Sequence, residues 1–178
     1  MDFTSDYQTR TDEITALFTA TFTASEGAGE GALIGALVRD MLQTPEDDLA
    51  VFLSLDADRV TGGICFSRLS FPQDPRRVFL LSPVAVATAE QGKGVGQALL
   101  RHGLQTLQAQ GVDVAVTYGD PNYYGKVGFR PVTADMVLPP LPLNHSEGWL
   151  AQSLDGAPLA PLQGPSTCVA ALNNPDYW

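Results

Sequence analysis

The stretch VAVATAEQGKGVGQALLRHGLQ, residues 84–105, decides how the rest of the sequence is interpreted. It places Gly92, Gly94 and Gly96 around Lys93, immediately before an apolar pattern with helical spacing. A glycine inside a helix costs about 1 kcal/mol relative to alanine. Three glycines at a helix start therefore indicate a ligand that needs the backbone to come close.

Two well-known nucleotide loops do not fit this spacing. The ATP loop requires a glycine five residues before a Gly-Lys-Ser/Thr triplet, whereas Gly92-Lys93 is followed by Gly94 and preceded at that distance by Ala87. The dinucleotide loop requires G-x-G-x-x-G directly after a strand. Here the spacing is G-x-G-x-G, after a gap of residues 87–91. A nucleotide-binding oxidoreductase is disfavoured for this reason.

The physical features of the stretch favour an anion. Without a Cβ, glycine lets amide N–H groups approach a ligand, and a helix N-terminus adds about half a positive charge. Lys93 adds a full one. The pattern is typical of a pyrophosphate cradle, and a helix start with merely flexible glycines is the structural alternative.

Two motifs here resemble those of the GNAT superfamily of N-acetyltransferases. The run QGKGVG, residues 91–96, is similar to the family's Arg/Gln-x-x-Gly-x-Gly/Ala signature, and PVAV, residues 83–86, is similar to the strand before it, with the family's usual spacing between the two. Downstream, YYGKVGF at 123–129 resembles the Tyr-x-x-x-Gly-Phe segment. The longer run 119–130 is closer still to the bacterial YhbS-like branch. The resemblance is sharp over 78–130 and architectural elsewhere.

The resemblance implies one acetyltransferase domain over 1–178, of α/β (α+β) class. Its central sheet would be mixed and mostly antiparallel, with a splayed strand pair and helices on both faces. The implied co-substrate is acetyl-CoA, with no metal, and the implied reaction is direct transfer of the acetyl group from the thioester to an amine. The residues implied to bind acetyl-CoA are Val84, Ala85, Val86, Gln91, Gly92, Lys93, Gly94, Val95 and Gly96.

The resemblance also implies roles around the thioester. In this family a free backbone N–H of the splayed strand, here near 84–86, polarises the thioester carbonyl, and Pro83 would help to keep that edge unpaired. Tyr124 stands four residues before Gly128 and matches the family's general acid. A tyrosine with a pKa near 10 is protonated at neutral pH. Tyr123 is the less favoured alternative, and the sequence identifies no general base.

Composition limits the partners. The formal net charge is −10, from 10 basic and 20 acidic residues, which disfavours nucleic acid and leans toward a cationic small-molecule or peptide amine. The sequence has neither a secretory leader at residues 1–10 nor an apolar run long enough to span a membrane, so we expect a cytoplasmic protein. Cys65 and Cys168 form neither a disulfide framework nor a metal-ligand spacing. Dimers are common in the family, so a homodimer is compatible with the resemblance.

Hydrophobic periodicity predicts the remaining architecture. Helices are expected from residue 11, over 32–42, after residue 94 and briefly from residue 120. Pro83 predicts either a bulge in its strand or a splayed neighbouring strand. Residues 24–31 and 131–148 are predicted to be loops, and we expect residues 23–31 and 131–148 to form the acceptor site. Strands are expected within 1–10 and over 49–55, 60–69, 78–86, 112–118, 149–154 and 167–172.

One alternative function stays open at this point. A non-catalytic acyl-CoA-binding or regulatory module could use the same fold, because a fold does not guarantee chemistry. The missing general base is compatible with such a module, whereas Tyr124 favours an enzyme.

Overall fold

The computed structural model describes all residues, 1–178, and its contacts group them into two compact units. The first unit comprises residues 1–66 and 83–103, and the second comprises 67–82 and 104–178. Seven strands form one sheet in the order β1-β2-β3-β4-β5-β7-β6. The expected mixed, mostly antiparallel sheet is therefore confirmed, whereas the expectation of a single domain stays a prediction.

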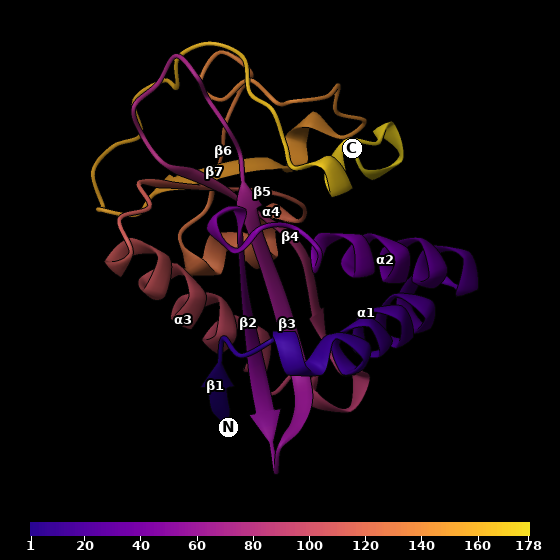
Figure 1. Ribbon diagram of the computed structural model, residues 1–178. Helices are drawn as coiled ribbons and strands as arrows, with labels where there is room; N and C mark the ends of the chain where they lie inside the picture. The colour runs from indigo at the N-terminus through magenta and orange to yellow at the C-terminus, as the bar shows by residue number, and fades with distance from the viewer. The chain divides into compact units, whose positions relative to one another are not determined.

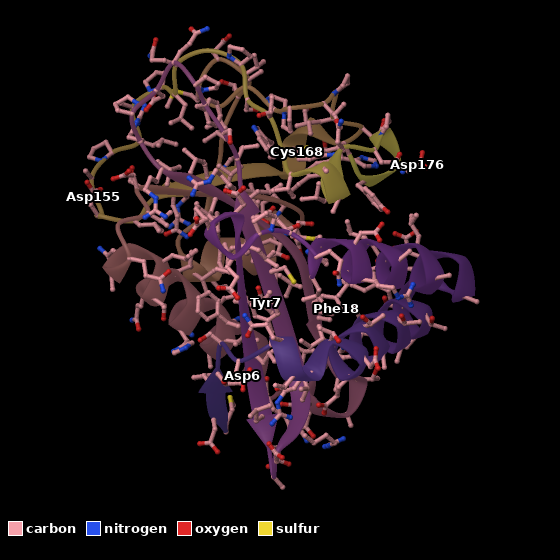
Figure 2. The ribbon with its side chains drawn as sticks, viewed as in Figure 1. Asp6, Tyr7, Phe18, Asp155, Cys168 and Asp176 are labelled. Atoms are coloured by element: carbon pink, nitrogen blue, oxygen red, sulfur yellow. The ribbon has the colours of Figure 1, made fainter.

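Two helices of the first unit, α1 (Thr11–Glu26) and α2 (Ala28–Met41), lie side by side (Figure 1). Asp12 and Glu13 occupy the first turn of α1, where negative charge favours a helix N-terminus. Phe18, labelled in Figure 2, is fully buried. Its ring would be 3.0 Å from a Cβ at Gly63. The helices thus bury one apolar face each, with Ile14, Leu17, Phe18, Ile34, Leu37, Val38 and Met41 in the core.

The prediction of a loop over 24–31 is wrong. Only Gly27, at φ +98°, separates the two helices, and α2 continues through the glycine-rich residues that follow. The reason is the close approach of the helices. A Cβ at Gly31 would lie 2.8 Å from the carbonyl oxygen of Thr19 and still closer to the Thr23 hydroxyl. Glycine at this position serves helix packing rather than loop formation.

The strands of the first unit form a meander. Strand β1 (Asp2–Thr4) is antiparallel to β2 (Leu49–Asp56), so the predicted first strand covers only the start of residues 1–10. A two-residue turn joins β2 to β3 (Arg59–Arg68), and both of its residues, Ala57 and Asp58, have positive φ angles of 47° and 65°. Two positive φ angles are typical of the type I′ turn, which matches the right-handed twist of the hairpin.

Strands β4 (Val78–Val86) and β5 (Val114–Tyr118) part before β4 ends. Their parallel pairing covers Val78↔Val114 to Leu81↔Thr117, whereas β4 continues for five more residues. This confirms the predicted splayed pair.

The second unit completes the sheet with β7 (Trp149–Ser153), which is antiparallel to β5 and to β6 (Arg130–Pro131). Strand β6 lies partly in the predicted loop 131–148 and is too short to produce a periodic signal. The predicted strand over 167–172 is wrong: Thr167 makes an isolated bridge to Ser70, and a 3₁₀ turn follows at Ala170–Leu172. The remaining helices are α3 (Val95–Ala109), which continues from the first unit, and α4 (Pro121–Tyr124).

An aromatic cluster holds the last residue of the chain, Trp178, without a strand. The rings of Trp149 and Trp178 lie 6.0 Å apart, and Tyr118 is 6.3 Å from each. Trp178 donates its indole N–H to the carbonyl of Leu172 at 2.9 Å. Burial in this part of the chain therefore comes from aromatic packing instead of strand pairing.

A buried carboxylate ties two irregular segments of the second unit together. Arg76 donates three hydrogen bonds to Asp74, two from its guanidinium and one from its backbone N–H, and the backbone N–H of Gln163 donates a fourth at 3.0 Å. Arg76 also donates to the carbonyls of Ala160 and Pro161, at 2.9 and 2.8 Å. The Asp74 side chain is only 2% exposed. Its hydrogen bonds with Arg76 lower the pKa of Asp74 well below its ordinary value.

The helices and the two cysteines each answer a question that the composition raised. No helix is long and apolar enough to cross a membrane. Both cysteines are free thiols, and burial raises the pKa of Cys65 to about 12, so this thiol is protonated at neutral pH.

The close contact of α1 and α2 generates a matched pair of variants. We expect Gly31→Ala to destabilise the fold by about 1–3 kcal/mol, because the new methyl group would meet the Thr19 carbonyl. Gly29→Ala, in the same helix, has nothing within 4 Å and should stabilise by about 0.5–1 kcal/mol. Urea denaturation measures both, and equal effects of the two variants would contradict the packing argument.

The hydrogen bonds of Asp74 with Arg76 and Gln163, called the Asp74 clasp below, predict a pH dependence of stability. The pKa of Asp74 is lower in the folded state than the ordinary value of about 4. Its contribution is therefore fully present above about pH 4 and is lost as the pH falls toward the folded-state pKa. We expect Asp74→Asn to lower the free energy of unfolding at pH 7 by about 2–4 kcal/mol and to flatten its decline in acid.

Asp176→Asn is the control for this prediction, because Asp176 is exposed (Figure 2). Thermal melts from pH 7 to pH 3 should be the same for this control as for the parent chain. A parent-like acid profile for Asp74→Asn would refute the role of the clasp.

Candidate functional site

The end of β4 carries one residue more than the strand beside it. The N–H of Leu69 donates to the carbonyl of Val78, and the N–H of Ala87 donates to the carbonyl of Thr61. Between these two bonds, β3 and the residue after it advance by eight residues, from Thr61 to Leu69. The chain of β4 advances by nine, from Val78 to Ala87. One extra residue in β4 is a β-bulge, as Pro83 predicted.

This bulge determines which way the backbone groups of 84–86 point. N–H groups alternate between the two edges of a strand, and that of Ala87 points to β3. By this alternation, the N–H groups of Val84 and Val86 point to the edge of β4 that faces away from β3. Ala85 is turned toward β3, since its carbonyl would be 3.4 Å from a Cβ at Gly62.

The connection after β4 is folded back on the strand. A 3₁₀ turn at Thr88–Glu90 reverses the chain, and the side-chain amide of Gln91 donates to the carbonyl of Val86 at 3.0 Å. The hydroxyl of Thr21, in α1, donates to the same carbonyl at 3.4 Å. Gln91 thus has a structural role as the anchor of the loop, and Thr21 is a contributor that sequence reasoning missed.

Gly92 and Gly94 both adopt positive φ angles, +76° and +83°. No atom lies within 4 Å of a Cβ built on either residue, so nothing crowds them and the backbone conformation is what requires glycine. The carbonyl of Gly94 accepts the first bond of α3, from Ala98 at 3.0 Å. Val95 and Gly96 are buried in the first turn, whose N–H groups have no carbonyl partner within the helix.

The charges beside this loop are partly paired. Lys93 lies 3.1 Å from Glu90, which also faces Arg59 at 3.8 Å. The Lys93 side chain is 60% exposed, so the ion pair is weak and the ammonium can turn toward another anion. Two cations and one carboxylate leave a local positive charge on a chain whose formal net charge is −10.

These features meet the requirements of a diphosphate group. Residues 91–94 are exposed, the space around Gly92 and Gly94 is open, and the first turn of α3 offers N–H donors. All nine residues predicted for this site lie on the end of β4, the following loop or the start of α3. No group of three or more histidine, cysteine, aspartate or glutamate side chains could hold a metal ion.

Tyr124, the predicted general acid, belongs to the second unit. It ends the short helix α4, which begins with Asp120 as the cap: the Asp120 carboxylate accepts from the N–H of Asn122 at 2.9 Å. The ring packs edge-on against Phe129 at 5.9 Å, and a Cβ at Gly119 would be 2.7 Å from it. Close packing therefore holds the ring in place.

The Tyr124 hydroxyl reaches the last rung of the β4–β5 pairing. It is hydrogen-bonded to Thr117, whose own hydroxyl donates to the carbonyl of Leu81 at 2.9 Å. Leu81 and Thr117 are the final partners before the strands part. Burial raises the pKa of Tyr124, and the nearby Tyr123 and Asp120 raise it further. Thr117 is a second contributor that the sequence alone did not reveal.

The comparisons with known proteins are consistent over most of the chain. A model of the GNAT acetyltransferase domain matches residues 7–132. The chain is 34% identical over 116 residues to the uncharacterized N-acetyltransferase YjhQ of Escherichia coli K12, a match that covers 62% of this chain and 64% of YjhQ. It is 29% identical over 93 residues to the uncharacterized N-acetyltransferase YhbS of the same strain, over 52% and 56% of the two chains. The matched stretches thus span less than two thirds of either relative.

Two solved structures share the fold. A GNAT family acetyltransferase from Brucella melitensis in complex with acetyl-CoA has a TM-score of 0.70 and 24% identity, over 96% of both chains. The YhbS N-acetyltransferase of Escherichia coli in complex with CoA has a TM-score of 0.78 and 21% identity, over 97% of this chain and 92% of that one. At this level of identity the likeness is evidence for the fold alone.

Proposed function

The chain belongs to the GNAT family of acetyltransferases, as its motifs predicted, and we propose that it transfers an acetyl group from acetyl-CoA to an amine. The observation that carries the proposal is the loop 91–96, where two glycines with positive φ and a free helix N-terminus leave backbone N–H groups open to a diphosphate. Relatives with the same fold have been crystallised with acetyl-CoA and with CoA, which supports the same donor here.

The proposed reaction begins with a neutral amine. Its nitrogen lone pair attacks the thioester carbonyl carbon, a C–N bond forms, and the carbonyl oxygen becomes an oxyanion. The N–H groups of Val84 and Val86, which point away from β3, are the candidate donors to that oxyanion. The C–S bond then breaks and the sulfur leaves as a thiolate, while the nitrogen releases its proton to water.

Tyr124 is the proposed source of the proton for the leaving thiolate. Its hydroxyl is bonded to Thr117, which in turn bonds the carbonyl of Leu81. The proposal rests on the match of Tyr124 to the family's general acid and on the interactions that hold its hydroxyl.

The amine acceptor, a homodimer and a cytoplasmic location stay predictions. A non-catalytic acyl-CoA-binding module is the second candidate function, and it is distinguished from the enzyme by the Tyr124 experiment below.

The loop provides the first test of donor binding. We expect Gly94→Ala to weaken CoA binding at least about tenfold, because alanine at φ +83° is strained and displaces the loop amides. Gly156→Ala is the matched control: its φ is +77°, nothing lies within 4 Å, and it belongs to a different turn. Both variants should lose similar stability in thermal melts.

Isothermal titration with CoA separates the two effects. Equal CoA affinity in the Gly94 and Gly156 variants would contradict the proposed cradle. Stabilisation of the parent chain by NAD instead of CoA would also refute it and would restore the oxidoreductase interpretation.

Tyr124→Phe tests the general acid. We expect kcat for acetyl transfer to fall about 100-fold or more, with CoA affinity unchanged, because only proton donation is lost. Tyr123→Phe is the control and should retain most of the activity. The pKa of Tyr124 is raised, so its protonated form persists above about pH 10 and the parent kcat should not decline below that pH through loss of this proton.

Thiol release measured across a panel of amines gives these values. An unchanged kcat in Tyr124→Phe would remove the residue from the mechanism. Tight CoA binding by the parent chain without turnover of any amine would favour the non-catalytic module.

A further inference from the structure

The second unit contains an open hollow of about 580 Å³ in the connection between β6 and β7. This volume lies within the usual range for small-molecule sites, about 300–1,000 Å³. The hollow lies mostly beyond the family match, which ends at residue 132. Its apolar walls are Pro131, Val132, Ala134, Pro139, Leu143 and Trp149.

The walls offer few hydrogen-bonding groups to a ligand. Trp149 is 1% exposed, and its indole N–H is already donated to the carbonyl of Val137 at 2.8 Å, so it presents only apolar surface. Beyond the apolar side chains, the lining contains the hydroxyls of Thr133 and Ser146 and the carboxylate of Glu147. Leu138, one of two large apolar side chains that are exposed, precedes the lining residue Pro139. The surroundings therefore favour an apolar ligand.

Glu147 is the one ionisable residue in this lining. Its side chain is 74% exposed and lies 3.4 Å from the Nδ1 atom of the exposed His145. A carboxylate on an otherwise apolar hollow attracts a cation and repels an anion. The ligand would then combine one ammonium group with an apolar body.

The hollow is connected to Tyr124 through two glycines. Gly148, next to Glu147, accepts a hydrogen bond from the N–H of Gly119 at 2.9 Å, and a Cβ at Gly148 would be 2.9 Å from the Gly119 carbonyl. Gly119 in turn packs on the ring of Tyr124, at 2.7 Å from a built Cβ. Backbone packing without intervening side chains therefore links the proposed general acid to the segment that carries Glu147.

We propose that this hollow binds the acceptor and that the acceptor is an apolar primary amine, with its hydrocarbon body on Val132, Pro139 and Leu143 and its ammonium beside Glu147. The inference rests on the proposed acetyl transfer. A polyhydroxylated amine such as an aminoglycoside fits poorly, because the walls could satisfy few of its hydroxyl groups. Before attack the bound ammonium loses one proton to water, and the remaining steps balance as described for the reaction above.

Binding can be measured without the donor. The chain has two tryptophans, Trp149 and Trp178, and both belong to the aromatic cluster at this hollow. Hexylamine should change their fluorescence saturably, and kanamycin should not. Leu143→Ser should weaken hexylamine binding about tenfold, whereas Leu138→Ser, an exposed leucine outside the lining, should leave it unchanged.

Turnover provides the second readout. With acetyl-CoA, kcat/KM should rise about fourfold for each methylene from butylamine to hexylamine, as expected for burial of CH₂ groups. Glu147→Gln should raise the KM for hexylamine about two- to fivefold without changing the KM for acetyl-CoA. Asp135→Asn, an exposed acid in the same connection but outside the lining, is the control.

The outcomes separate this inference from the proposed function. A chain that binds hexylamine but not CoA would refute the acetyltransferase and leave the hollow as an amine site. A chain that binds CoA but shows no dependence on chain length, prefers kanamycin or a lysine peptide, or responds equally to Leu143→Ser and Leu138→Ser would overturn the apolar-amine proposal.

Discussion

Pairing between β4 and β5 stops at Leu81 and Thr117, and the backbone groups beyond that point have to find other partners. An unpaired N–H or carbonyl is costly when buried, so a strand that leaves its neighbour must be compensated. The carbonyl of Val86 is satisfied by Gln91 and Thr21, which draws the following loop and helix α1 to the strand end. The outward N–H groups of Val84 and Val86 have no equivalent side-chain acceptor, which makes them suitable donors to a ligand oxygen. The extra residue in β4 determines which of its N–H groups face β3 and which face away from it.

Because the chain is strongly acidic, backbone N–H donors are well suited to bind an anionic ligand. A formal net charge of −10 opposes the approach of a diphosphate, and only 10 basic residues are present in total. Positive potential therefore has to be local. The first turn of α3 and Lys93, which is paired with Glu90, provide it. Under the proposed function, the same acidic background would favour a cationic acceptor, so one charge distribution would oppose the donor and attract the acceptor.

Sequence reasoning succeeded where the information is local and failed where packing decides. The glycines of 91–96 and the Pro83 bulge were predictable, because positive φ angles and a missing N–H are properties of the residues themselves. The glycines of 27–31 looked like a loop but belong mainly to α2, since their role depends on Thr19 and Thr23 across the helix pair. The apolar run 167–172 looked like a strand, but only Leu172 in it is buried, and Thr167 pairs with Ser70 in an isolated bridge. Thr117 became a candidate only once its contacts to Tyr124 and Leu81 were known.

The two compact units carry different parts of the proposed chemistry. The loop that would hold the donor lies in the first unit, whereas Tyr124 and the hollow belong to the second, and β4 contributes residues to both. The family match ends at residue 132, close to where the lining of the hollow begins. Donor binding needs a backbone conformation that one short motif can specify, so it can be shared across relatives. Acceptor binding needs only compatible walls on an irregular connection, which can change without disturbing the sheet. Under the proposed function, acceptor specificity is therefore to be sought in 131–149, outside the motif that identifies the family.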